Sequence, residues 1–440
     1  MTKARTTARS SPTVPDSAAN FALNVAALML GLAVLYAMVS GWSGYGDYLS
    51  YAPLLPCIAV FLIIALVERT LRRRGLLKQG EMMRAELRPI DLRRVAVRML
   101  GLAATLGLVA FAYWLFPEYS GSFYAPYWKF LTALAPLLLL TPAYLSWVDM
   151  HAENPRDELV EFGYFLLRGL HSENPAAIRR HVLGWTVKAF FLPLMTVYLN
   201  NDFNALINYR REGLAFMFAN FDFWFTLSYT IDLLFCVIGY TAALRLFDSQ
   251  IRSVEPTALG WIAALLCYQP FFSVISQFYL PYESATNYSV WLRHWPTLRD
   301  MWGGAIIFLL MIYSFSTVAF GLRFSNLTHR GIITSGPYRF SKHPAYLSKN
   351  LSWWLVSVPF VASQEASVAL RHCMALLLLN GVYFVRARTE EQHLSRDPTY
   401  VAYARWIDAH GMLSVLNRRI PWLRYRAPSA ARCVDSGLQS

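Results

Sequence analysis

Long apolar segments recur along the chain of 440 residues and are separated by shorter polar connections. A helix needs roughly 20 mostly apolar residues to cross a hydrocarbon core about 30 Å thick. The pattern predicts an all-α integral membrane protein with about ten transmembrane helices. The expected spans are Phe21–Ser40, Tyr51–Val67, Val95–Phe116, Trp128–Trp147, Val182–Leu199, Phe223–Leu244, Leu259–Leu280, Met301–Leu322, Leu351–Val361 and Ala366–Val385. The ninth is too short to cross alone, so we expect it to form a hairpin with the tenth or to begin within Ser348–Trp354.

The composition supports a membrane protein and excludes an ordinary soluble one. Hydrophobic residues make up 56% of the chain and charged residues only 15%, whereas about a quarter of the residues are charged in a typical soluble domain. Aromatic residues reach 15%, which suits a chain that lines many membrane interfaces. The five cysteines are scattered without metal-ligand or redox spacing, so no metal site is predicted.

The basic residues indicate how the chain is oriented. The net charge of +13 falls mostly in loops, which indicates contact with anionic lipid headgroups rather than with nucleic acid. The connection Arg69–Arg98 is crowded with Lys and Arg, whereas Gly41–Ser50 and Pro117–Tyr127 contain none. Because Lys and Arg collect in cytoplasmic loops, we expect both termini to be cytoplasmic, in a bacterial inner (plasma) membrane.

Four parts are expected along the chain. They are a disordered cytoplasmic leader at residues 1–20, an N-terminal transmembrane bundle of about seven helices at 21–300, a membrane module at 301–413 and a basic cytoplasmic tail at 414–440. Asp232 is an ionisable residue inside an expected span, and such residues are functional candidates. A transporter would show several of them, with broken helices in two matching halves. No such symmetry is evident, so transport is the less favoured interpretation.

The first polar cluster precedes the ninth span and contains Ser335-Gly336-Pro337-Tyr338-Arg339-Phe340-Ser341-Lys342-His343-Pro344-Ala345-Tyr346. Pro344 is well placed as the first residue of a helix, where its missing N–H costs little. The start of that helix would offer free N–H groups beside basic side chains, which is typical of an anion site. A basic loop that touches lipid phosphates is the alternative interpretation.

The second polar cluster follows the tenth span and contains Arg386-Ala387-Arg388-Thr389-Glu390-Glu391. Helical spacing allows ion pairs between Arg386 and Glu390 and between Arg388 and Glu391. Two adjacent acids are poorly placed to bind anionic lipids, however. They favour a ligand that has hydroxyls and a positive charge.

The two clusters together resemble the isoprenylcysteine carboxyl methyltransferase and phospholipid methyltransferase superfamily, over roughly Leu322–Leu413. The resemblance implies an integral-membrane enzyme that uses S-adenosylmethionine. It implies a cofactor-binding site made of Tyr338, Lys342, His343, Pro344, Tyr346, Glu390 and Glu391, facing the cytoplasm. It also implies catalytic roles for Arg386, Arg388 and Glu391. Two positions differ from the family pattern, with Lys342 in place of Arg and Ser348 in place of Gly.

The predicted function is therefore methylation of a lipophilic or lipid-linked acceptor through a carboxylate, amine or thiol, with S-adenosylmethionine as the cofactor. The alternative is an NADPH-dependent membrane reductase, because sterol C14 reductases are similar in span count and have a basic residue before His-x-x-Tyr. Charge favours methyl transfer, since adjacent carboxylates attract a sulfonium and repel phosphates. The acceptor and membrane lipids are the expected partners.

Overall fold

The computed structural model of the protein describes residues 13–41, 54–75, 87–169, 174–283, 287–361 and 365–426. Most of the expected leader and the end of the expected basic tail lie outside these residues. The described part of the leader, residues 13–20, packs along the segment that precedes the first polar cluster. There the Ala18 amide donates to the Ile332 carbonyl at 2.8 Å, and the Thr334 hydroxyl donates to the Pro15 carbonyl at 2.7 Å.

The described residues are mostly helical. The α-helices of the first half are α1 (Phe21–Gly41), α2 (Leu54–Arg73), α3 (Leu92–Leu115), α4 (Ala125–Leu134), α5 (Thr141–His151), α6 (Glu158–Arg168), α7 (Pro175–Arg211), α8 (Leu214–Ala219) and α9 (Phe221–Thr241). Those of the second half are α10 (Ala258–Leu265), α11 (Phe271–Val274), α12 (Tyr288–Trp291), α13 (Pro296–Phe320), α14 (Pro344–Ser357), α15 (Ala366–Leu394), α16 (Pro398–His410) and α17 (Ser414–Arg419). Two short antiparallel strands, β1 (Ser253–Val254) and β2 (Thr328–His329), pair Ser253 with His329.

Six helical stretches within the described residues are long and apolar enough to cross a membrane. They are Leu92–Leu115, Ser122–His151, Pro175–Arg210, Phe221–Thr241, Pro296–Arg323 and Ala366–Leu394. The chain is thus an all-α, multi-pass membrane protein, as predicted. The count of ten spans and the cytoplasmic position of both termini stay predictions.

Two expected spans depart from a regular α-helix where prolines occur. The seventh, Leu259–Leu280, divides into α10, α11 and a π-helical turn at Ile275–Tyr279, and the chain between α10 and α11 contains Pro270. The fourth, Trp128–Trp147, contains a 3-10 segment, Ala135–Leu140, between α4 and α5. Proline has no N–H to donate and its ring clashes with the preceding turn, so it breaks a helix interior.

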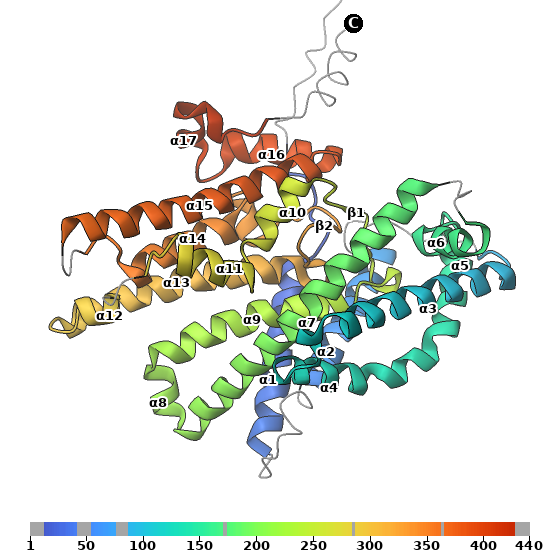
Figure 1. The fold of residues 1–440 in the computed structure, drawn as a ribbon, viewed down its shortest axis with the longest axis horizontal. Helices are drawn as coiled ribbons and strands as arrows, with labels where there is room; N and C mark the ends of the chain where they lie inside the picture. The colour runs from blue at the N-terminus through green and yellow to red at the C-terminus, as the bar shows by residue number, and fades with distance from the viewer. Residues whose placement is uncertain are drawn as a thin grey trace, which may run out of the picture.

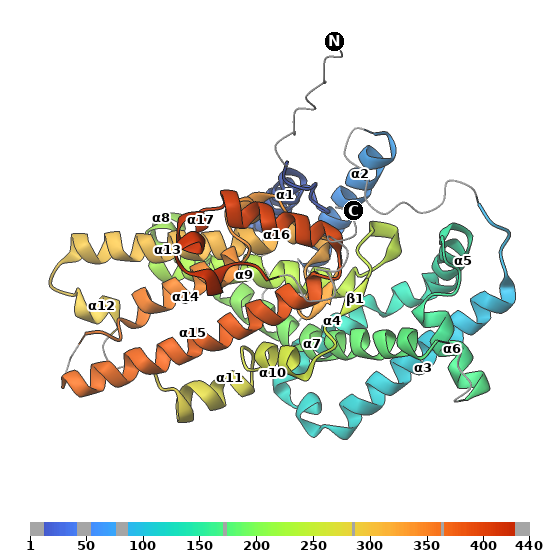
Figure 2. The same cartoon turned by 90° about the horizontal axis from the view of Figure 1, so that it is seen from above.

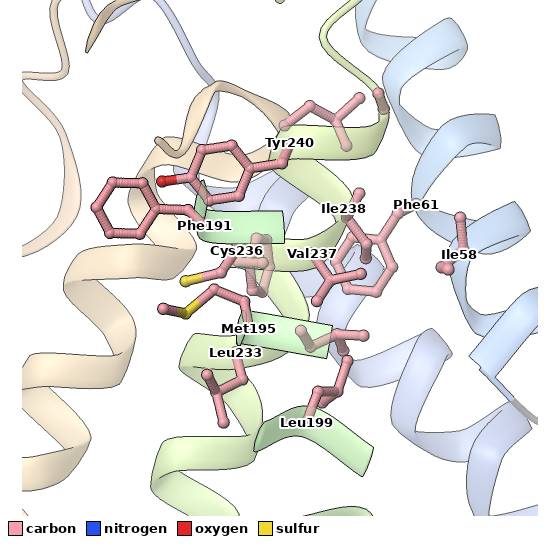
Figure 3. Packing of buried hydrophobic residues seen from close by; sticks show 14 of the residues in the cluster. Ile58, Phe61, Phe191, Met195, Leu199, Leu233, Cys236, Val237, Ile238 and Tyr240 are labelled. Carbon is pink, nitrogen blue, oxygen red and sulfur yellow. The ribbon is translucent and has the colours of Figure 1, made fainter. Parts of the chain in front are cut away.

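The main hydrophobic core lies where α2, α7 and α9 meet. Phe61, Phe191 and Phe235 are nearly or fully buried there, and the Phe61 and Phe235 rings pack edge to face at 5.0 Å. Figure 3 shows how side chains of α7 and α9 interlock, with Phe61 and Ile58 of α2 beside them. Because α9 belongs to this core and also packs along α13, it joins the N-terminal bundle to the C-terminal part.

The C-terminal part is built on α13, α14 and α15, which lie side by side in both views (Figures 1 and 2). The ends of α9, α13 and α15 converge near β1 and β2, whereas α8 and α12 lie at their other ends (Figure 1). α16 covers the first polar cluster, since the Tyr403 hydroxyl donates to the Tyr338 carbonyl at 2.6 Å. Both polar clusters are thereby held at one end of this helix group.

Candidate active site on two faces of a helix pair

The first cluster is shaped by one glycine and one proline. Gly336 has φ +62°, and a Cβ there would lie 2.8 Å from the Phe21 ring, so a larger residue would be strained and crowded. After a 3-10 turn, Gly336–Arg339, the chain reaches Pro344, which is the first residue of α14. The predicted helix start at Pro344 is thus confirmed. It places His343 directly before α14 and Tyr346 in its first turn.

An outer cavity of about 350 Å³ lies against one face of α14 and α15. Its size falls within the roughly 300–1,000 Å³ of pockets that hold small ligands. Its polar lining includes Lys342, His343, Tyr346, Asn350, Asn380, Arg388, Glu391 and Asn417, and its apolar lining includes Leu347, Leu351, Trp354, Phe384 and Leu423. Asn380 connects the two helices, because it donates to Asn350 Oδ1 at 2.7 Å and accepts from the Trp354 indole at 2.8 Å.

Glu391 is the centre of the charges around the outer cavity. One of its oxygens lies 3.0 Å from the Lys342 ammonium and 3.2 Å from His343 Nε2, and the other accepts from Arg388 at 2.7 Å. The Glu391 side chain is only 7% exposed, so these contacts are shielded from solvent. The Lys342 ammonium also lies 3.0 Å from Asp408. The carboxylate of Glu391 is therefore surrounded by cationic partners before any ligand binds.

An inner cavity of about 100 Å³ lies against the opposite face of the same helices. Its polar lining includes Asp232, Tyr268, Tyr313, Thr317, Asn326, Tyr338, Lys349, Arg386 and Glu390. The Arg386 guanidinium donates to Asn326 Oδ1 at 2.7 Å and lies over the rings of Tyr268 and Tyr346, at 5.4 and 5.1 Å. Glu390 accepts from the Tyr346 hydroxyl at 2.7 Å.

The two adjacent acids do not act as a pair. Glu390 lines the inner cavity and Glu391 the outer one, because neighbouring residues of a helix point about 100° apart. The expected pair of Arg388 with Glu391 forms, whereas Arg386 binds Asn326, with no ion pair to Glu390 among the described residues. The adjacent carboxylates were expected to repel the phosphates of NADPH. This argument is weakened for Glu391, because Lys342 and Arg388 already offset its charge.

Three residues line both cavities and separate them. They are His343, Tyr346 and Tyr383. The rings of His343 and Tyr346 are stacked at 5.5 Å, and Tyr383 packs edge-on against Tyr346 at 5.8 Å. A ligand in either cavity would touch this shared wall, which we define as these three residues.

The remaining predicted residues take clear positions. Tyr338 lines the inner cavity, while Lys342 and Arg388 line the outer one. Pro344 is buried and lines neither cavity, so its contribution is to begin α14. The sequence-based prediction did not assign Asn350 or Asn380 to the site, although both amides line the outer cavity.

Residues just beyond the cavities fix the surrounding segments. The imidazole of His329, 3.3 Å from Asp397, lowers the pKa of that carboxyl to about 2. This contact ties β2 to the start of α16, whose N-cap is Asp397. Burial raises the pKa of the Tyr403 hydroxyl above its usual range, so this hydroxyl stays a neutral donor to the first cluster.

The chain was compared with known proteins after this geometry was established. Residues 304–396 match the model of the Isoprenylcysteine carboxyl methyltransferase (ICMT) family. The match contains all of α14 and α15 and most of α13, and it includes both polar clusters. The resemblance predicted for the C-terminal part is confirmed, and it supports a membrane methyltransferase. No curated protein and no solved structure matches the chain.

Proposed function

We propose that the protein transfers the methyl group of S-adenosylmethionine to a lipophilic acceptor within the membrane. The observation that carries this proposal is the outer cavity, which is lined mainly by residues of the matched segment, from both polar clusters. The inner cavity, on the other side of the shared wall, is the proposed site of the acceptor's polar group. The expected cytoplasmic position of the site is retained in this proposal.

The outer cavity fits S-adenosylmethionine in chemistry as well as in size. Trp354 and Phe384 offer aromatic surface to an adenine ring, and the amides of Asn350 and Asn417 offer partners for ribose hydroxyls. Lys342 and Arg388 suit the carboxylate of the methionine part, and Glu391 holds these two cations in place for it. The residues His343 and Tyr346 of the first cluster line this cavity and belong to the shared wall.

The chain mainly supplies alignment for such a reaction. When bound, S-adenosylmethionine supplies a methyl group made electrophilic by its positive sulfonium. Bond formation to the acceptor's nucleophilic atom accompanies cleavage of the carbon–sulfur bond, whose electron pair stays on sulfur. Glu391 holds His343, Lys342 and Arg388 in place, and Glu390 fixes the Tyr346 hydroxyl. Such preorganisation is a large source of rate enhancement in reactions of two bound partners.

Calorimetric titration of the purified full-length protein with S-adenosylmethionine and with NADPH tests the proposal. We expect binding of S-adenosylmethionine, and about tenfold weaker binding in Trp354→Leu, because stacking of a base on an aromatic ring contributes about 1–3 kcal/mol. Trp302→Leu is the matched control, since Trp302 donates its indole N–H to the Leu355 carbonyl and lines neither cavity. Binding of NADPH without binding of S-adenosylmethionine would favour the reductase instead.

The methylated product can be sought directly. Membranes that contain the protein are incubated with S-adenosylmethionine carrying a deuterated methyl group, and lipid extracts are analysed by mass spectrometry. We expect a lipid species that gains one labelled methyl group and is absent from membranes without the protein. A wild-type protein that binds S-adenosylmethionine but labels no lipophilic molecule would contradict the proposed acceptor class.

A further inference from the structure

The inner cavity receives one carboxylate from outside the family match. Asp232 lies on α9 in the N-terminal bundle and is only 7% exposed. The Tyr313 hydroxyl donates to Asp232 Oδ2 at 2.5 Å, and the Thr317 hydroxyl donates to Oδ1. Both donors are on α13, so the carboxylate is held in one orientation and faces the cavity. Among the described residues, no Lys, Arg or His lies within ion-pair distance of Asp232.

Lys349 brings an opposite charge to the same cavity. Its ammonium lies among three aromatic rings, 5.1 Å from the centre of Tyr313, 5.6 Å from Trp353 and 5.8 Å from Tyr229. The faces of aromatic rings attract a cation. They are not conventional hydrogen-bond acceptors for the three N–H groups of an ammonium. Within the part of the chain that the structure describes, Lys349 has neither a hydrogen-bond acceptor nor an ion-pair partner.

The other charged groups of the cavity are already engaged. Arg386 donates to Asn326, Glu390 accepts from Tyr346, and Glu255 accepts from the Thr257 amide. Lys349 is thus a cation without an acceptor among the described residues, and Asp232 is a carboxylate whose two hydrogen bonds leave lone pairs open to a further donor. A charge held inside a membrane protein without a partner is costly, and such residues commonly mark a ligand site.

The size of the cavity limits what can fill it. About 100 Å³ exceeds the roughly 10–15 Å³ that a cavity needs to hold one water molecule. It is well below the roughly 300–1,000 Å³ of a pocket that holds a whole drug-sized ligand. The space suits a headgroup of a few heavy atoms.

We propose that the inner cavity recognises a zwitterionic headgroup of the acceptor, with its ammonium at Asp232 and its anionic group at Lys349. This inference rests on the proposed function and specifies the class of substrate. A headgroup with only an anion would leave Asp232 unpaired, and one with only a cation would leave Lys349 unpaired. Because Asp232 comes from α9, the N-terminal bundle contributes directly to the choice of acceptor.

Three amphiphiles with the same chain length test this recognition. They are 2-aminotetradecanoic acid, which is zwitterionic, tetradecanoic acid, which is an anion, and tetradecylamine, which is a cation. Their dissociation constants are measured by calorimetry with the full-length protein in lipid nanodiscs. We expect the wild type to bind the zwitterion most tightly.

Two variants should change this preference in opposite ways. Asp232→Asn should weaken binding of the zwitterion and of the amine tenfold to hundredfold, and leave the fatty acid unchanged, because only the charge-assisted contact to the ammonium is lost. Lys349→Gln should weaken the zwitterion and the fatty acid instead. Thr230→Val is the control on α9, since the Thr230 hydroxyl donates to the Thr226 carbonyl and lines neither cavity. If one variant does not fold, the loss of affinity measured for the other variant still tests the proposal.

Titration of S-adenosylmethionine on the same samples separates this inference from the proposed function. Its affinity should be unchanged in Asp232→Asn and Lys349→Gln, because neither residue lines the outer cavity. If the wild type binds S-adenosylmethionine but does not distinguish the three amphiphiles, the inference is overturned and the proposed function stands. If the wild type does not bind S-adenosylmethionine, the proposed function fails, whatever the amphiphiles do.

Discussion

Replacing Glu391 by glutamine should destabilise the protein through the cations that this carboxylate holds. The change leaves Lys342 with Asp408 alone, and Arg388 with the carbonyls of Trp422 and Arg424. Removing one partner of a buried ion pair costs about 3–5 kcal/mol when the other charge has no alternative partner, and loss of one charge-assisted hydrogen bond costs about 1.5–3 kcal/mol. Both cations keep an acceptor and the amide oxygen still accepts one bond, so we expect a loss of about 2–3 kcal/mol.

The free energy of unfolding can be measured by titrating the protein in mixed micelles with a denaturing detergent and following tryptophan fluorescence. Glu365→Gln is the matched control at the N-cap of α15, because Glu365 is exposed and accepts from the Ser367 hydroxyl at 3.1 Å. The control should change the free energy of unfolding by no more than about 0.5 kcal/mol, as is usual for surface substitutions. Glu390→Gln should have a smaller effect than Glu391→Gln, since an amide oxygen can still accept from Tyr346.

Equal free energies of unfolding for Glu391→Gln and Glu365→Gln would refute this reasoning. They would mean that the cations around Glu391 are satisfied elsewhere and that the cluster does not hold the outer cavity together. The contact with Glu391 would then not explain the position of His343.

Two other predictions concern pH and topology. The folded-state pKa of Asp397, about 2 beside His329, lies below the roughly 3.9 of an unfolded chain. Ionised Asp397 therefore stabilises the fold above pH 4. The difference in unfolding free energy between the wild type and Asp397→Asn should shrink as the pH falls from 5 towards 2, and a difference that stays constant would contradict the lowered pKa. Single cysteines can be introduced as Arg88→Cys and Ser335→Cys in a background without reactive native cysteines. Both should react with an impermeant thiol reagent from the same, cytoplasmic side. Labelling from opposite sides would contradict the predicted topology.

The sequence predicted the helical membrane class and the beginning of α14 because both depend on local rules. Apolar length indicates a span, and Pro344 favours the first turn of a helix. The two clusters were also predicted to lie close together, and His343 does contact Glu391 across 48 positions of the chain. The match to a known family pattern, rather than periodicity, made that prediction possible.

The division of the site into two cavities could not be predicted from spacing alone. Glu390 and Glu391 are neighbours in sequence, and only the packing of α14 against α15 decides which cavity each acid lines. Asp232 was recognised as unusual, but its partners Tyr313 and Thr317 lie more than 80 residues away on α13. The expected span Leu259–Leu280 is likewise divided between α10 and α11, and apolar length alone does not reveal where a helix is interrupted.

The shared wall of His343, Tyr346 and Tyr383 makes the two cavities thermodynamically linked. A ligand in the outer cavity and a ligand in the inner cavity would both contact these rings, because the three residues line both cavities. Any shift of a ring that favours one ligand changes the free energy of binding the other. By reciprocity, the factor by which the first ligand changes the affinity for the second equals the factor by which the second changes the affinity for the first. A dissociation constant measured with one cavity empty therefore describes only half of a thermodynamic cycle, and the ternary complex has to be measured to complete it.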